Sequence, residues 1–370
     1  MTGSLSKEDF IVGLDRSQAV LGGLPVTRAV TAHLSAQLKK GEPAWWKAVL
    51  CAWEGRRFVA WTEAWSLLVA CLHFEALNDA DNPLVPYFPS CGGTDEADPT
   101  PGLAKFLGGA FAASKTFAEN LASGQRRSYL PARAPLWMAP AALYFQTREL
   151  PYYLVEVNAG AGLHLAADLL FPARGFESDL VAARVGLDAA PLELEDILHR
   201  RWLTAGVFPD HREAIAALDQ AVEFALERLR REPRFIQLAP CPPETAARFI
   251  AKNIPPEGPE VGLLVLNTAT TSRMTDEEYK VYSAGLSEVL KAWNERALWV
   301  EVENVRGELH STTHQLRVHR MVGGEVRSCV MASIDHDAAK TSYARESESF
   351  LSSGAPGGRR GVLPLRFPGF

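Results

Sequence analysis

The fold is decided by the stretch Glu156-Val157-Asn158-Ala159-Gly160-Ala161-Gly162, which ends an apolar run, Tyr152–Val157, and leads into Leu163–Leu170. The apolar run predicts a β-strand, the glycines predict a tight turn, and the residues after them predict the start of a helix. Glycine is needed where the backbone takes positive φ or where a ligand comes close to it. Amides at the start of the following helix can then bind a polar or anionic group. The stretch therefore predicts a nucleotide-like cofactor site, with a plain tight turn as the alternative.

The hydrophobic period of the chain changes near residue 150. Up to that point apolar residues recur at helical spacing and β-branched runs are scarce, which predicts an N-terminal helical domain over residues 1–150. From Pro151 onward the pattern alternates between strands and helices. Strands are expected at Tyr152–Val157, Leu180–Leu187, Arg234–Ala239, Val261–Asn267 and Leu298–Val302.

Two further alternating runs, Gln315–Met321 and Val326–Ile334, are joined by a glycine-containing segment, which predicts a β-hairpin. Strands that alternate with helices indicate an α/β fold, in which a parallel sheet is covered by helices on both faces. We therefore expect a doubly wound, mostly parallel sheet over residues 151–340 that ends in an antiparallel hairpin. Residues 341–370, rich in Ser, Gly, Pro and Arg, are expected to form a loosely ordered tail.

Local signals mark the ends of several helices. Ser6–Asp9 and Thr275–Glu278 have the spacing of a capping box. Asp210 is expected to cap a long helix that ends near Arg231, and Gly102–Ala122 is expected to form one helix.

Five tryptophans gather in the N-terminal half, at positions 45, 46, 53, 61 and 65. Such a cluster can line a substrate pocket or fill the space between helices. Because large aromatic side chains dominate the packing of protein cores, the sequence favours the second interpretation.

Composition excludes several classes of protein. The chain has 370 residues, of which 47% are hydrophobic and 22% are charged, with a net charge of −6. No basic stripe is present, which argues against a nucleic-acid binder. The apolar runs are too short to span a bilayer, and we expect neither a membrane segment nor a secretory signal. The five cysteines are widely spaced, so neither disulfides nor a cysteine metal site are expected, and a reducing cytoplasm is the simplest location.

The expected parallel strands, the terminal hairpin and the acidic residue before the glycine turn together resemble the class I S-adenosylmethionine-dependent methyltransferase core. The first motif of that family is acidic-x-Gly-x-Gly-x-Gly, and here Asn158 replaces the first glycine. Asn is the residue other than glycine that most readily takes left-handed φ. Asp188 matches the acidic residue at the end of the second strand that, in the family, binds the ribose hydroxyls. The resemblance implies that S-adenosylmethionine is bound by Glu156, Asn158, Gly160, Gly162 and Asp188.

A second resemblance covers most of the chain and is to an uncharacterised bacterial family of the same presumed Rossmann-like class. The matching segments are Asn82–Leu84, Tyr87–Ser90, Ala161–Leu165, Arg184–Leu192 and Phe208–Asp210, together with Glu156. After the fourth strand, where the family usually shows His-Ser, this chain carries Asn267 and Thr268.

Polar residues follow the fourth and fifth expected strands. Asn267 and Thr268 lie at the carboxyl edge of the sheet, where ligands bind in open α/β folds, so they are candidates for holding a substrate. A loop that only leads into a helix is the alternative. Glu301 and Glu303 share one face of the fifth strand and can bind a cation or act as a general base. The alternative is a polar strand face that leaves the sheet.

The histidines offer weaker candidates. His336, between two aspartates, is a candidate general base or part of a solvated turn. His164 follows the glycine turn and can contact a ligand or pack in the first helical turn. His310, His314 and His319 lack the spacing of a helical metal site, and no metal is expected.

The expected function is methyl transfer from S-adenosylmethionine to a small cytoplasmic molecule. Alignment of the reactants supplies much of the catalysis in such a transfer, so the sequence need not contain a dedicated nucleophile. A nicotinamide- or flavin-dependent oxidoreductase is the first alternative, but the third glycine of its fingerprint would fall on Leu165. The second alternative is a non-catalytic cofactor-binding or scaffolding protein. Neither a nucleophile elbow nor a phosphate-binding loop is present in the sequence.

Overall fold

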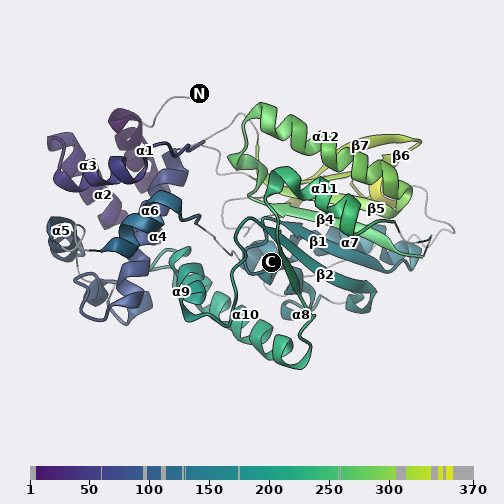
Figure 1. Cartoon of the computed structure of the whole chain (residues 1–370), viewed down its shortest axis with the longest axis horizontal. Coiled ribbons are helices and arrows are strands. Elements are labelled where there is room, and N and C mark those ends of the chain that lie inside the picture. The colour runs from purple at the N-terminus through teal and green to yellow at the C-terminus, as the bar shows by residue number, and fades with distance from the viewer. Residues whose placement is uncertain are drawn as a thin grey trace. The chain divides into compact units, whose positions relative to one another are not determined.

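The computed structural model describes residues 6–352 except 60, 95–97, 110–113, 127–128, 130, 174–175, 257, 259, 306–313, 335–340 and 345–346. The chain forms two compact units. The first is Met1–Tyr129 with Glu195–Asp219, and the second is Leu130–Leu194 with Gln220–Phe370 (Figure 1).

The first unit is helical. Its elements are α1 (Lys7–Val20), α2 (Pro25–Lys40), α3 (Ala44–Ala52), α4 (Trp61–Asn78), the 3₁₀ turns η1 (Val85–Tyr87) and η2 (Pro89–Cys91), α5 (Thr100–Gly108), α6 (Lys115–Ser123) and α9 (Ile197–Ala205). The helix α10 (Arg212–Arg231) begins in this unit and ends in the second. The tryptophan cluster forms core, as the sequence favoured: Trp46 is buried and its ring stacks on Phe10 at 5.1 Å.

One expectation for these helices is wrong, and one helix was not expected. Gly102–Ala122 forms two helices rather than one, because α5 ends at Gly108 and Ser114 caps α6 by accepting from the Phe117 amide. The sequence analysis also missed α9, which Asp196 caps at the Leu198 amide. Ser6 does cap α1 by accepting the Asp9 amide, and the capping box at Thr275 begins α12 (Asp276–Trp293).

The two units divide the chain differently from the expected ranges 1–150 and 151–340. Residues 195–219 belong to the first unit because Trp202 packs edge-on against Phe74 of α4, with ring centroids 5.3 Å apart. Residues 130–150 belong to the second unit because Phe145 stacks on Tyr152 of the first strand at 4.2 Å. A boundary inferred from the hydrophobic period does not reveal such long-range packing.

Asp210 caps a helix other than the one expected. Its carboxylate accepts the Val26 amide at 2.8 Å and the Thr27 amide at 3.1 Å, so it satisfies the start of α2 across 184 residues of chain. It does not begin α10, whose first residue is Arg212. The first unit is therefore closed by a residue from the middle of the sequence.

The second unit is built on an eight-stranded mixed sheet in the order β3-β2-β1-β4-β5-β6-β7-β8. The strands are β1 (Tyr152–Val157), β2 (Val181–Asp188), β3 (Gln237–Pro240), β4 (Gly262–Thr268), β5 (Ala297–Asn304), β6 (His314–Val322), β7 (Glu325–Ile334) and β8 (Thr341–Tyr343). The first five are mutually parallel, and the last three pair antiparallel. This confirms the expected α/β fold with a mostly parallel sheet and a C-terminal antiparallel hairpin.

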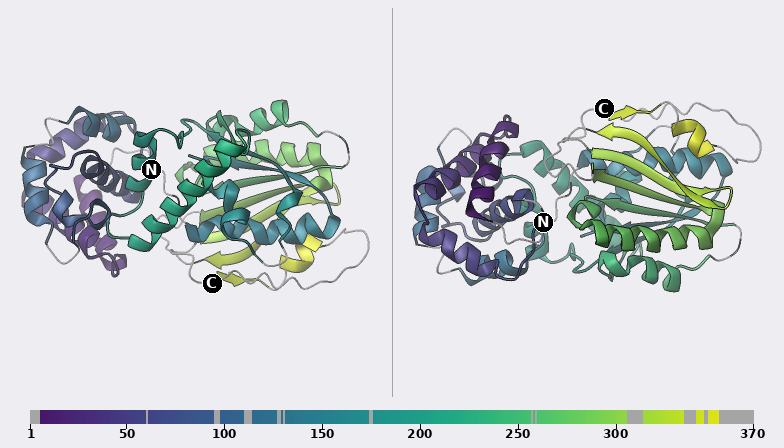
Figure 2. Two further views of the ribbon diagram at one scale, coloured as in Figure 1. Left: turned by 90° about the horizontal axis from the view of Figure 1, so that it is seen from below. Right: turned by 90° about the horizontal axis from the view of Figure 1, so that it is seen from above.

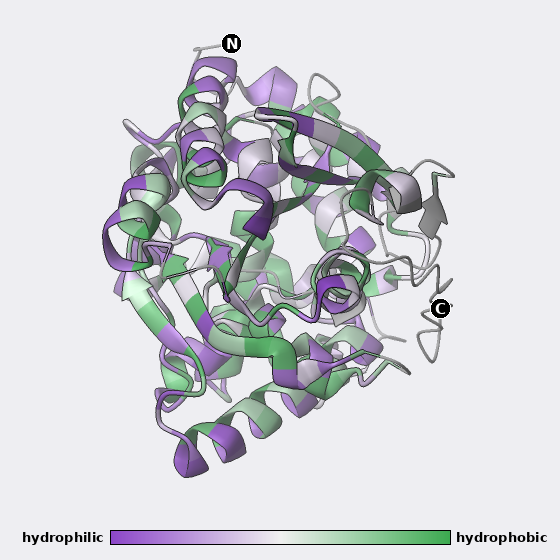
Figure 3. Ribbon diagram, turned by 90° about the vertical axis from the view of Figure 1, so that its right-hand side faces the viewer, coloured by the Kyte–Doolittle hydropathy of each residue, from purple (hydrophilic) through white to green (hydrophobic). Residues whose placement is uncertain are grey.

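Helices lie on both faces of this sheet. Both views in Figure 2 place α11 (Pro243–Asn253) and α12 together on one side. The other side carries α7 (Met138–Tyr144) and α8 (Ala167–Leu170), together with the short turns that contact them, η4 (Pro131–Trp137), η5 (Gln146–Arg148) and η6 (Leu163–Ala166). The remaining short elements are η7 (Ser178–Leu180), η8 (Thr271–Arg273), η9 (Asn294–Arg296) and α13 (Ser347–Ser352). Polar and apolar residues alternate along several helices, as Figure 3 shows, because these helices bury one face only; α4 differs, since residues 64–74 are all buried.

Part of the expected loosely ordered tail at residues 341–370 forms regular structure, and residues 353–370 lie outside the described residues. Thr341–Tyr343 forms β8, which pairs with Ala332–Ile334 at the edge of the sheet, and Ser347–Ser352 forms α13. Within the part of the chain that the structure describes, no helix has the length and apolar character needed to cross a membrane.

A buried ion pair fixes the segment after the glycine turn to the sheet. The Arg184 guanidinium in β2 donates two hydrogen bonds of 2.7 Å to the Asp168 carboxylate in α8, and a further bond to the Leu165 carbonyl. Arg184 and Asp168 are 6% and 2% exposed, so neither charge is compensated by water.

We predict that Asp168→Ala destabilises the second unit by about 3–5 kcal/mol, because it leaves the Arg184 charge buried without its partner. Urea unfolding followed by circular dichroism measures the loss. The double variant Asp168→Leu/Arg184→Met should recover most of it, because two apolar groups need no partner. Arg231→Ala, which breaks the exposed pair with Glu227, is the control and should change little. If Asp168→Ala proved as stable as Arg231→Ala, the prediction would be contradicted.

The cap at α2 generates a second prediction. Asp210→Ala should destabilise the first unit by about 2 kcal/mol, because two helix amides lose their buried acceptor. Asp196→Ala removes the more exposed cap of α9, which accepts one amide, and should have a smaller effect. Equal losses of unfolding free energy in the two variants would show that burial of the α2 cap is not important.

Candidate functional site

The glycine turn lies at the carboxyl end of β1. Asn158, Gly160 and Gly162 all have positive φ, at 66°, 59° and 73°, so each residue takes the left-handed conformation that the turn requires. Asn158 thus adopts the left-handed conformation that was expected at the position of the first glycine of the motif. The turn is joined to the end of β2, because the Asn158 and Ala159 amides both donate to the Leu187 carbonyl.

Asp188 closes the turn from the end of β2. One oxygen of its carboxylate accepts the Gly160 amide and the other accepts the Ala190 amide, each at 2.8 Å. The residue is 0% exposed. The structure therefore brings Asp188 and Gly160 together, as predicted, but the carboxylate bonds to the backbone of the protein itself.

The segment after the turn differs from the expected helix. It consists of η6 and α8, each of four residues, so no extended helix points its N-terminus at the turn. A helix dipole that could favour an anion needs several aligned peptide units. The expected anion site at a helix N-terminus is therefore not supported here. Leu165 fills the space instead, with its side chain packed against the positions of Gly162 and Gly186.

Glu156 and His164 form a buried pair beside the turn. His164 Nδ1 donates to Glu156 Oε1 at 2.7 Å, and Glu156 is 2% exposed. Its second oxygen, Oε2, is buried and has no hydrogen-bond partner among the described residues. Burial raises the pKa of the Glu156 carboxyl; Asp188 adds to the effect and His164 opposes it. This site therefore holds one carboxylate oxygen to which no described residue donates.

Strand register puts Glu156 and Asn267 on opposite faces of the sheet. Glu156 pairs with Leu266, whereas Asn267 pairs with Val157 on one side and with Glu301 on the other. Because side chains alternate across a strand, Asn267 and Glu301 share one face and Glu156 lies on the other. Glu156, predicted to bind the cofactor, and Asn267, predicted to bind the substrate, therefore lie on separate faces of the sheet.

Asn267 and Glu303 are brought together, but their polar atoms are already used. Asn267 Nδ2 donates to Glu303 Oε1 at 2.7 Å, while Asn267 Oδ1 accepts Trp299 Nε1 at 2.6 Å. Glu303 also accepts the backbone amides of Thr270 at 2.7 Å and Ser272 at 3.1 Å. Burial raises the pKa of the Glu303 carboxyl, and Glu301 raises it further. Both residues thus hold the loop after β4 in place.

A hydrogen-bonded chain that the sequence analysis missed runs from Glu301 to the surface. His319 Nε2 donates to Glu301 Oε2 at 2.8 Å, and His319 Nδ1 meets the exposed Ser328 hydroxyl at 2.7 Å. Tyr279 also donates to Glu301 Oε2, at 3.3 Å. The His319 ring stacks on Trp299 with centroids 4.0 Å apart. Only the pairing of β5, β6 and β7 brings these residues together, and nothing in the linear spacing indicates it.

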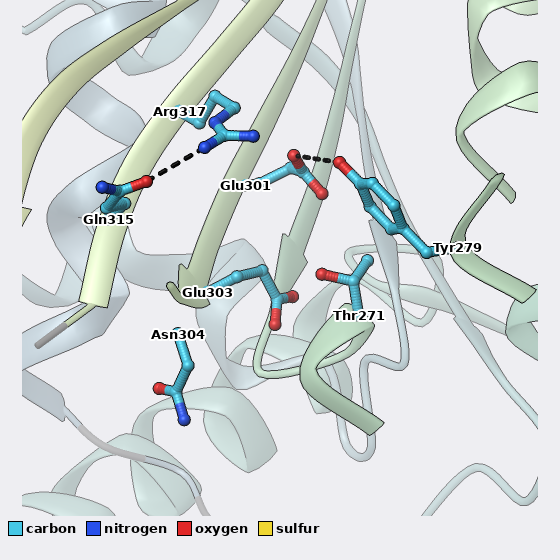
Figure 4. Close-up of a pocket in the computed structure, with 7 residues that line it drawn as sticks. All are labelled: Thr271, Tyr279, Glu301, Glu303, Asn304, Gln315 and Arg317. Atoms are coloured by element: carbon cyan, nitrogen blue, oxygen red, sulfur yellow. Dashed lines mark hydrogen bonds between the residues drawn. The ribbon is translucent and has the colours of Figure 1, made fainter. Parts of the chain in front are cut away.

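A small pocket of about 20 Å³ opens beside this chain (Figure 4). It has room for little more than a water-sized group. Its lining residues come from the loop after β4, from α12 and from the ends of β5 and β6: Thr271, Tyr279, Glu301, Glu303, Asn304, Gln315 and Arg317.

The remaining candidates lie elsewhere. Thr268 pairs with Val302 and therefore points to the face opposite Asn267. His314 is buried, with its Nδ1 3.5 Å from Arg133. His310 and His336 lie outside the described residues. Among the residues that are described, no cluster of histidine, cysteine and carboxylate side chains has the geometry of a metal site.

These observations define an α/β protein whose mixed sheet carries buried carboxylates at the carboxyl ends of its parallel strands. The chain belongs to the family described as "uncharacterized protein conserved in bacteria (DUF2332)", whose sequence profile matches residues 16–171 and 170–339. The match confirms the resemblance to an uncharacterised bacterial family. No curated protein matches the chain.

We predict that Glu156→Gln changes how stability depends on pH. The folded pKa of Glu156 lies above its ordinary value of 4.5, so between the two values the folded state keeps a proton that the unfolded state has lost. The stability from this proton is present below pH 4.5 and is lost as the pH rises through the folded pKa. The variant does not titrate there, so its free energy of unfolding relative to wild type should increase from acidic to neutral pH.

Chemical unfolding across this pH range measures the effect. Glu244→Gln, which removes a carboxylate at an exposed position, is the control. A free-energy difference between Glu156→Gln and wild type that does not change with pH would mean that Glu156 ionises as easily in the folded chain as in the unfolded one.

Proposed function

We propose that this protein is an S-adenosylmethionine-dependent methyltransferase that acts on a small molecule. The observation that carries the proposal is the position of the glycine turn. It follows β1, which lies between β2 and β4, and the strand order β3-β2-β1-β4-β5 reverses its direction at this point. In open α/β sheets, ligands bind in the crevice outside the carboxyl ends of the strands at such a switch point.

The residues at this turn fit a nucleoside-type cofactor with a cationic part. The positive φ values of residues 158 and 160 suit a turn whose backbone a ligand can approach, whereas the Cβ side of Gly162 already faces Ile236 and Leu238. Glu156 holds a buried carboxylate oxygen that no described residue satisfies, and a ligand donor or positive charge would stabilise it. When bound, S-adenosylmethionine supplies a methyl group on a positively charged sulfonium. Glu156 and the turn would hold and orient it, which is the main requirement of such a transfer.

The hydrogen bonds of Asp188 limit how a cofactor could bind at this turn. Its two oxygens accept the Gly160 and Ala190 amides, so ribose binding at this carboxylate requires one of these bonds to be shared or exchanged. The same observation favours a second candidate, a non-catalytic cofactor-binding or scaffolding protein. Asn267 and Glu303 favour it too, because both are engaged with the loop after β4. A dinucleotide-dependent oxidoreductase is less well supported, because the buried Leu165 stands where its third glycine would be.

We predict micromolar binding of S-adenosylmethionine and S-adenosylhomocysteine in calorimetric titrations, and no binding of NAD or NADP. Gly162→Val should abolish binding, because the residue has φ 73° and a Cβ there would lie 2.9 Å from Ile236. Asn158→Gly, which keeps the turn and supplies the glycine of the methyltransferase motif, should bind at least as well as wild type.

The matched control is Gly323→Val in the β6–β7 turn, which also has positive φ but meets no neighbour within 4 Å. It introduces the same backbone strain away from the glycine turn and should leave binding intact. Thermal unfolding of each variant separates lost binding from lost folding. Binding of a dinucleotide alone would disprove the proposal, and no binding of any of the four compounds would favour the non-catalytic candidate.

A further inference from the structure

The pocket between α12 and the end of β5 contains a carboxylate that is only half satisfied. Glu301 is 3% exposed, and its Oε2 receives both available donors, His319 and Tyr279. Its Oε1 is buried and has no hydrogen-bond partner among the described residues. A buried carboxylate oxygen without a donor is unfavourable, because the desolvation of the charge is not compensated.

The other acidic residue in the pocket does not share this property. Glu303 accepts the amides of Thr270 and Ser272 and the side-chain amide of Asn267, so its two oxygens are both used. It nevertheless adds a second negative charge next to Glu301, and this proximity contributes to its raised pKa. A cationic group near Glu301 would offset both charges.

Arg317 places a positive charge at the other side of the same pocket. It lies directly opposite Glu301 in the β5–β6 register, which brings the Cβ atoms of the two residues to about 5 Å from each other. The guanidinium does not form an ion pair with Glu301; it donates instead to Gln315 Oε1 at 3.0 Å (Figure 4). The Glu301 carboxylate and the Arg317 guanidinium thus line one pocket without forming an ion pair with each other.

We propose that this pocket binds the ammonium and carboxylate groups of an amino-acid-type ligand, with the ammonium on Glu301 and the carboxylate on Arg317. The ammonium supplies the donor that Glu301 Oε1 lacks and occupies the cavity of about 20 Å³, whereas the carboxylate lies at its opening on Arg317, whose side chain is only partly buried. Arg317 provides the forked donor geometry that matches a carboxylate. Ligand binding at this site does not depend on the proposed function.

The experiment uses the full chain and glycine as the smallest probe with both groups. Methylamine and acetate each carry one of them. The reporter is the ¹⁵N indole signal of Trp299, assigned with Trp299→Phe, because this ring stacks on His319 and its Nε1 bonds Asn267. Glycine should shift the signal saturably, and methylamine and acetate should each bind at least tenfold more weakly.

Glu301→Gln and Arg317→Gln should each weaken glycine binding at least tenfold. Arg327→Gln, which removes an exposed arginine from the neighbouring strand β7, is the matched control and should bind as wild type does. Thermal unfolding shows whether each variant is folded, and Arg317, which bonds only Gln315 among the described residues, keeps the test valid if Glu301→Gln fails to fold. Equal affinity for glycine and methylamine, or no glycine response in the wild type, would overturn the proposal.

Titration of the same samples with S-adenosylmethionine separates this inference from the proposed function. Glycine binding without S-adenosylmethionine binding would support the pocket and reject the methyltransferase proposal. S-adenosylmethionine binding without a glycine response would do the reverse.

Discussion

Burial of carboxylates at the carboxyl ends of the parallel strands is the constraint on which the rest of the site depends. Glu156, Asp188, Glu301 and Glu303 are all at most 6% exposed, so each oxygen needs a donor from the protein or from a ligand. Asp188 and Glu303 obtain theirs from backbone amides, and in doing so they fix the glycine turn and the loop after β4. Glu156 and Glu301 each keep one oxygen without a donor among the described residues. The acidic residues thus divide into two that shape the loops and two that can act on a ligand.

The strand register separates the two carboxylates that remain incompletely satisfied. Glu156 lies on the face of the sheet that also carries Arg184 and Asp168, whereas Glu301 lies on the face covered by α12. Each has a histidine partner, His164 for Glu156 and His319 for Glu301. The sheet therefore carries two similar carboxylate–histidine pairs on its two faces, beside a turn suited to a cofactor and beside a small pocket.

Much of the fold could be predicted from the sequence, because local chemistry determines it. The bounds of β1 agree with the apolar run at Tyr152–Val157, and the capping box at Thr275 begins α12. The positive φ of Asn158 follows from its place in the glycine motif. These features depend on residues close together in the chain, which is where sequence patterns are informative.

The site was less predictable because it depends on contacts between distant residues. The positions of Ser328, His319 and Glu301 in the sequence do not indicate that these side chains are hydrogen-bonded to one another. They meet only because β5, β6 and β7 pair in one particular register. Asn267 and Glu303 were identified as polar residues at the correct edge, but their use as anchors of the loop depends on backbone amides.

The Asp210 cap has a consequence for how the protein is made. The first unit includes residues 195–219, so its helices cannot complete their packing until this segment has left the ribosome. By then β1 and β2 have also left the ribosome, while β3 and the later strands have not. The N-terminal helices and a partial sheet must therefore coexist as incomplete structures during translation. The helical unit can therefore complete its packing only in nascent chains from which residue 219 has emerged.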